Sequence, residues 1–119
     1  MKVIYIAGPY RNKSEYEVGE NIRVAGWYSL HVWELGGVAL CPHKNTAFFG
    51  GAYNIPDDTW LKGDLELLNR CDAVYVTSNW SESSGATAEV EFAKNHNIPV
   101  LYTRQTLRDF LASETSDEK

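Results

Sequence analysis

A short apolar run near the start of the chain, Val3 to Ala7, restricts the fold more than any other feature. It is rich in β-branched residues and stops at Gly8-Pro9, which is typical of a strand buried on both faces of a parallel sheet. Three further runs of this kind follow, at Val38 to Cys41, Ala73 to Val76 and Ile98 to Tyr102. We expect the four runs to be strands of one sheet.

The segments between these runs carry apolar residues at helical spacing. Ser14 and Glu17 form an S-x-x-E capping box, in which the serine side chain and the glutamate satisfy free amides reciprocally. A helix is expected to begin there and to end at a left-handed turn in Gly36-Gly37. Two more helices are expected, one capped by Asp57 or Asp58 and ending near Arg70, and one from about Gly85 to Asn95.

The alternation of strands and helices predicts a three-layer α/β fold of the flavodoxin or Rossmann-like type. We expect a parallel sheet of four to five strands with helices on both faces. The 119 residues fit one domain, placed at residues 1–112, with a polar tail at 113–119 after a last amphipathic turn or two. Ligands of such sheets bind beyond the carboxyl ends of the strands, where the loops at residues 8–13, 42–56 and 77–84 are expected to gather.

Composition and charge exclude several classes of protein. With 44% hydrophobic and 13% aromatic residues the chain can build a packed core, and its net charge of -5 argues against polymeric nucleic acid or a membrane as partner. Cys41 and Cys71 lack CxxC spacing, and His43 beside Cys41 has no second pair, so neither a disulfide framework nor a metal site is expected. The first apolar run is too short for a signal peptide or membrane span, so a cytoplasmic protein is expected.

Glu89 is the foremost candidate for chemistry. It lies four residues after Gly85, about one helical turn, and therefore close to the carboxyl edge of the sheet. It also lies between Ala86 and Val90 on the inward side of the helix, whereas Glu91 turns toward solvent. The positive end of the helix dipole favours the ionised carboxylate that a nucleophile requires. Acidic residues are also common in first turns because they suit the dipole, so position alone leaves a structural role open.

Asp64 is the second candidate. It lies beside Leu61 and Leu68, near the apolar stripe of its helix. Partial burial near Glu89 is expected to raise its pKa and let it hold or donate a proton, as in the paired carboxylates of glycosidases. A side chain at this position can instead reach out to solvent. Asp72 is interpreted as a turn residue between helix and strand.

Three segments resemble the nucleoside 2-deoxyribosyltransferase superfamily: Gly8-Pro9-Tyr10-Arg11, Asp64 to Val74, and Ser83 to Glu89. The match covers most of the chain in order. It resembles especially the short phage and bacterial members and the deoxynucleoside 5′-monophosphate N-glycosidases. The resemblance implies an enzyme in which the carboxylate at the Glu89 position attacks C1′ of the sugar and the base leaves. Water or a second base then resolves the glycosyl-enzyme.

The resemblance also implies roles for other residues. Asp64 matches the family aspartate near the sugar, which suggests orientation or protonation of the leaving base. The classical transferases carry an aspartate six residues before the nucleophile, where this chain has Ser83. The monophosphate N-glycosidases have a serine there that contacts the 5′-phosphate, and an arginine like Arg11 in the first loop. This departure favours hydrolysis of a monophosphate. Relatives of this kind are dimers or larger, with neighbours completing the site, and no cofactor is implied.

A phosphate pocket built from Arg11, Ser83 and helix-terminal amides is physically sound. Aromatic faces at Tyr10, Trp80 and the loop around His43 and Asn45 can stack on a base, although loop aromatics are as often contacts between subunits. The predicted substrate-binding residues are Gly8, Pro9, Tyr10, Arg11, His43, Asn45, Trp80, Ser83, Ser84 and Gly85.

Two other functions compete with a glycosidic enzyme. One is a nucleotide-binding or sensor module that has the pocket without the chemistry. The other is a dinucleotide-binding protein, which the sequence disfavours because Gly8-Pro9-Tyr10 follows the first strand in place of G-x-G-x-x-G.

Overall fold

The structure, a computed structural model, describes residues 1–117, with side chains up to Ser113. The strands are β1 (Val3–Ala7), β2 (Val38–Leu40), β3 (Ala73–Val76) and β4 (Val100–Leu101). The α-helices are α1 (Glu15–Glu34), α2 (Pro42–Asn45), α3 (Asp57–Leu68), α4 (Ser84–Asn95) and α5 (Arg104–Asp117), and two 3₁₀ turns, Ala52–Asn54 and Trp80–Glu82, lie in loops. None of the described helices is long and apolar enough to cross a membrane.

The four strands form one parallel sheet in the order β2-β1-β3-β4. The chain moves from β1 to one side for β2 and to the other side for β3, so the direction of winding reverses between β1 and β3. Ligands bind such sheets in the crevice beyond the carboxyl ends of the strands at this reversal. The predicted α/β fold, with parallel strands and helices on both faces, is confirmed.

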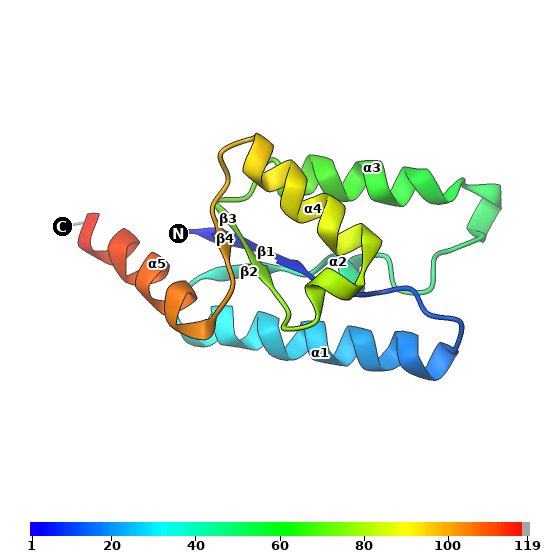
Figure 1. Cartoon of the computed structure of the whole chain (residues 1–119), viewed down its shortest axis with the longest axis horizontal. Helices are drawn as coiled ribbons and strands as arrows, with labels where there is room; N and C mark the ends of the chain where they lie inside the picture. Colours follow the sequence, from blue (N-terminus) through cyan, green and yellow to red (C-terminus); the bar gives the residue numbers. More distant parts are fainter. Residues whose placement is uncertain (118–119) are drawn as a thin grey trace.

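Side chains of successive β1 residues enter different halves of the core. Ile4 and Ile6 pack on the side of α1 and α5, and Tyr5 and Ala7 pack on the side of α3 and α4. Figure 1 shows the same division, with α1 below the sheet and α3 and α4 above it. Because side chains alternate along a strand, the tyrosine in this aliphatic run must face α4.

The loops after β1 and β3 approach each other closely at the reversal point. A Cβ atom on Gly8 would lie 2.5 Å from Oγ1 and 2.7 Å from Cγ2 of Thr77, which follows β3. Only glycine therefore fits without displacing the Thr77 side chain. This contact holds the floor of the crevice between the two central strands.

The first helix begins as predicted but only half of the expected capping box forms. The Ser14 Oγ accepts a hydrogen bond from the Glu17 amide at 3.3 Å. The Ser14 amide instead donates to Oδ1 of Asn12 at 3.1 Å, because an asparagine two residues back satisfies it locally. The Glu17 side chain therefore takes no part in the cap, and Glu17 lines the crevice. The left-handed turn is confirmed, since Gly36 has φ of 90°.

Three other expected boundaries differ. Pro42 starts the short helix α2, because its missing amide costs nothing at a first helical position, so the segment 43–56 is less irregular than expected. Pro56 is the N-cap of α3 without a side-chain bond, while Asp57 and Asp58 form ion pairs with Arg11 and Lys62. The fourth strand, β4, covers Val100–Leu101 and is shorter than the expected run from Ile98 to Tyr102.

The last helix is longer than the one or two turns expected around residues 107–111, since α5 runs from Arg104 to Asp117. Residues 113–117 of the expected tail are therefore helical, and residues 118 and 119 lie outside the described part. The division at residue 112 stays a prediction.

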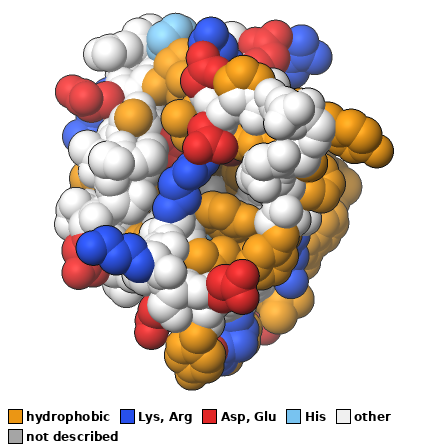
Figure 2. Space-filling model, turned by 90° about the vertical axis from the view of Figure 1, so that its right-hand side faces the viewer, with side chains coloured by type: hydrophobic (Ala, Val, Ile, Leu, Met, Phe, Trp, Pro, Cys, Tyr) orange, Lys and Arg blue, Asp and Glu red, His pale blue; other side chains and the backbone are white. Residues whose placement is uncertain are grey.

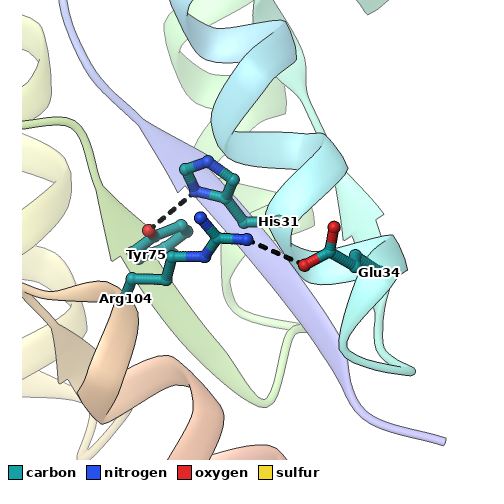
Figure 3. A network of polar contacts seen from close by, with 4 residues as sticks. All are labelled: His31, Glu34, Tyr75 and Arg104. Carbon is teal, nitrogen blue, oxygen red and sulfur yellow. Dashed lines mark hydrogen bonds and ion pairs between the residues drawn. The ribbon is translucent and has the colours of Figure 1, made fainter.

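A polar network joins α5 to α1 and β3 (Figure 3). Nδ1 of His31 lies 3.0 Å from the Tyr75 hydroxyl, and Arg104 forms an ion pair with Glu34 at 2.8 Å. Partial burial and the nearby guanidinium of Arg104 lower the pKa of His31. These contacts fix the C-terminal end of α1 against the start of α5.

Candidate active site

A cleft of about 1050 Å³ lies beyond the carboxyl ends of β1 and β3. Figure 2 shows this end of the molecule, where hydrophobic side chains lie in a hollow with acidic and basic side chains around it. Its walls come from the loop after β1, the first half of α3 and the start of α4. The cleft therefore lies at the place that the topology of the sheet predicts.

The cleft collects most of the residues that the sequence singled out. Among its lining residues are Gly8, Pro9, Tyr10, Arg11, His43, Asp64, Ser83, Ser84, Gly85 and Glu89. Two predicted residues are not in its described lining. Asn45 lines a smaller cavity of about 510 Å³ beside β2, and Trp80 packs against the core on the α4 side, with its ring 5.9 Å from that of Tyr102.

Glu89 lies at the inner wall of the cleft, in the second turn of α4, and is partly buried. The hydroxyl of Tyr5, a fully buried residue of β1, donates a hydrogen bond to its Oε2. Burial raises the pKa of Glu89 to about 8; the Tyr5 hydrogen bond opposes this shift and the charge of Asp64 adds to it. The ionised resting state expected from the helix dipole is therefore wrong, because desolvation outweighs the dipole.

Asp64 faces the same cleft from α3, and the carboxyl groups of Asp64 and Glu89 are close enough to affect each other. Partial burial raises the pKa of Asp64 to about 6, as the sequence predicts. Between pH 6 and 8 the pair therefore shares one proton, which resides mainly on Glu89. Two carboxyl groups with one proton can act as nucleophile and acid in turn.

Tyr5 is the site residue that sequence reasoning missed. Burial and the adjacent Glu89 raise its pKa, so its hydroxyl keeps the proton that it donates. A signal was present in the sequence, since one tyrosine interrupts the otherwise aliphatic run from Val3 to Ala7. A buried hydroxyl needs a partner, and alternation along the strand places it on the α4 side.

His43 supports the wall of the cleft through hydrogen bonds to the backbone of the loop after β1. Its Nε2 lies 3.1 Å from the carbonyl oxygen of Gly8 and 2.9 Å from that of Pro9, so this nitrogen carries the hydrogen. Burial lowers the pKa of His43, which keeps the ring neutral. Nδ1 of His43 and Nε1 of Trp60 are buried and have no hydrogen-bond partner among the described residues, and both residues line the cleft.

The start of α4 offers hydrogen-bond donors to the cleft. Ser83 is the N-cap, and its Oγ accepts a hydrogen bond from the Ala86 amide at 3.1 Å, which leaves the hydroxyl hydrogen available. Ser84 and Gly85 follow in the first turn, where backbone amides lack partners within the helix. Arg11 lies across the cleft in an exposed ion pair with Asp57 at 3.2 Å. In the described part of the chain, no three His, Cys, Asp or Glu side chains cluster as a metal ion would require.

A family model for a domain of unknown function, DUF7768, matches residues 2–103. The chain belongs to the DUF7768 family. None of the curated proteins is significantly similar to it.

Two solved structures resemble this DUF7768 chain. A 2-deoxyribosyltransferase from the psychrotolerant bacterium Bacillus psychrosaccharolyticus has a TM-score of 0.63 and 19% identity over 82% of this chain and 69% of its own. A conserved protein from Enterococcus faecalis V583 has a TM-score of 0.68 and 19% identity over 84% of this chain and 61% of its own. The structural resemblance to the 2-deoxyribosyltransferases is confirmed at the level of the fold, and this chain spans less than two thirds of the Enterococcus protein.

We predict that Glu89→Gln flattens the pH dependence of stability. Since the pKa of Glu89 is raised from its ordinary 4.5 to about 8, the folded state holds this proton where the unfolded state has lost it. Stability is therefore lost as pH rises toward 8. From pH 6 to 8 the wild type should lose about 2 kcal/mol relative to Glu89→Gln, measured by urea unfolding.

Glu91→Gln, on the exposed side of the same helix, is the control and should follow the wild type. Parallel stability curves for the wild type and Glu89→Gln would show that Glu89 has no raised pKa.

Proposed function

We propose that this DUF7768 domain cleaves the N-glycosidic bond of a deoxynucleoside 5′-monophosphate or nucleoside, with Glu89 as nucleophile. The observation that carries the proposal is the partly buried Glu89, bonded to Tyr5 and coupled to Asp64 in the cleft. A surface carboxylate that only suits a helix dipole needs neither burial nor a tyrosine partner. The likeness in fold to a 2-deoxyribosyltransferase supports the same assignment.

In the proposed reaction, the proton that the pair shares first moves from Glu89 to Asp64. Glu89 as carboxylate then attacks C1′ while the bond from C1′ to the base nitrogen breaks. Asp64, in its protonated form, gives its proton to the departing base. Water then attacks C1′ of the glycosyl-enzyme and loses a proton to Asp64, which frees Glu89; a second base in place of water would give transfer. Tyr5 supports this sequence because its hydrogen bond favours the ionised form of Glu89, which burial disfavours.

The phosphate part of the proposal rests on Arg11, Ser83 and the amides at the start of α4. Five acidic residues line the cleft, against the two basic residues Arg11 and Lys13, so a phosphate needs these donors. The bond of Arg11 to Asp57 is a surface ion pair, a type that stabilises by about 1 kcal/mol at most, so a phosphate can replace Asp57. Acidic lining residues are Glu15, Glu17, Asp64, Glu82 and Glu89.

The resting proton on Glu89 is the observation that favours the alternative function, a non-catalytic nucleotide-binding or sensor module. In that case the cleft binds a nucleotide and no base is released. The cytoplasmic location expected from the sequence stays a prediction under either function.

We predict release of free base when the protein is incubated with deoxynucleosides or their 5′-monophosphates, with and without an acceptor base. Glu89→Gln should lower the rate at least about a thousandfold, because a carboxamide cannot form the ester at C1′. Chromatography of the bases measures the rate, and Glu91→Gln serves as control. Thermal stabilisation by a nucleotide without base release from any substrate would favour the binding module.

We also predict that Arg11→Gln raises the KM for a 5′-monophosphate about tenfold and changes the KM for the matching nucleoside less than about twofold. A charge-assisted hydrogen bond to phosphate contributes about 1.5–3 kcal/mol, and the nucleoside lacks this group. Arg70→Gln, in an ion pair with Glu66 at 2.9 Å elsewhere on the surface, is the matched control. Equal losses for both substrates would refute the phosphate pocket and leave the role of Glu89 untouched.

A further inference from the structure

We infer that the outer face of α1 is the contact surface between two copies of this chain. Trp27 and Leu30 are 53% and 62% exposed on the side of α1 opposite the buried Ala25, Ser29 and Val32. Figure 1 shows α1 as an outer layer, with no other described element beyond it. Large apolar side chains at the centre of an outward helix face are a recurrent mark of an interaction surface.

The exposed residues follow the spacing of packed helix pairs. Arg23, Trp27, Leu30 and Glu34 are separated by four, three and four positions, so they form one seam along the helix. The two apolar side chains lie at the centre of this seam and the two charged ones at its ends. Paired helices have this order, in which apolar residues are covered and charges form the rim.

The seam is complementary to itself. A twofold axis midway between Trp27 and Leu30 pairs two antiparallel α1 helices so that Trp27 packs on the partner's Leu30. The same axis brings Arg23 opposite the partner's Glu34 at both ends. An unrelated partner would have no reason to match this reversal of charge, and a second copy matches it by symmetry.

The charges at the ends already belong to ordered pairs. Arg23 forms an ion pair with Glu20, and its guanidinium lies 4.6 Å from the centre of the Trp27 ring. Glu34 is held by Arg104 at 2.8 Å (Figure 3). Across the axis these pairs make a row of alternating charge: Glu20, Arg23, the partner's Glu34 and the partner's Arg104. A row of alternating charges is more favourable than isolated surface pairs.

The exposed apolar area on α1 fits a dimer interface that extends beyond the seam. Trp27 and Leu30, with the flanking Tyr16 and Trp33, expose on the order of 400 Å², and a stable interface needs about 800 Å² from each partner. Trp33 is 52% exposed and lines the smaller cavity beside β2, one of the two edge strands of the described sheet. The surface that continues from Trp33 along β2 can supply the remaining area.

The test measures the mass of the full chain in solution by sedimentation equilibrium at micromolar concentration. The wild type should be a dimer, and Leu30→Glu should weaken association at least a hundredfold, because it places two carboxylates in the apolar centre. Tyr53→Glu, at a 97% exposed aromatic residue outside α1, is the matched control and should stay a dimer. Circular dichroism confirms that each variant is folded.

Charge reversal tests the twofold arrangement itself. Arg23→Glu alone and Glu34→Arg alone should each weaken the dimer, since like charges then meet at both ends. A mixture of the two variants should form a dimer, because opposite charges meet at both ends of the mixed pair. A monomeric wild type, a Leu30→Glu variant that stays dimeric, or a mixture that stays monomeric would each overturn the proposal.

Discussion

The hydrogen bond from Tyr5 to Glu89 joins the central strand to the helix that carries the candidate nucleophile, and the geometry of the site depends on it. It places a carboxyl group where burial raises its pKa to about 8, and it is the contact that opposes that shift. The protein thereby keeps a carboxyl group in a poorly solvated wall of the cleft. Such an arrangement lowers stability as pH rises, a loss that a purely structural carboxyl group on the surface would not cause.

The rest of the fold serves this contact. Side-chain alternation along β1 sends Tyr5 toward α4, and the reversal of winding between β1 and β3 opens the cleft directly above. The close approach of Gly8 to Thr77 holds the two strand ends together, and His43 fixes the carbonyl groups of the first loop. Asp64 completes the site from the facing helix α3.

Much of this could be predicted from the sequence. The run from Val3 to Ala7 and the alternation of strands and helices after it predict the parallel sheet. Helical spacing predicts that Glu89 lies on the inward side of its helix. The protonation of Glu89 could not be predicted, because it depends on desolvation by residues distant in sequence. The packing of Trp80 against the core could not be predicted for the same reason, because the sequence does not show which residues cover a loop aromatic.

The central claim, that Glu89 forms a covalent bond to the sugar, can be tested by trapping. A 2′-deoxy-2′-fluoro-arabino nucleoside and its 5′-monophosphate carry a fluorine that slows both formation and breakdown of a glycosyl-enzyme. We expect mass spectrometry of the intact protein to show one added fluorinated sugar, located on the peptide that contains Glu89 and missing from Glu89→Gln. An adduct on another residue, or base release by Glu89→Gln at the wild-type rate, would contradict the account.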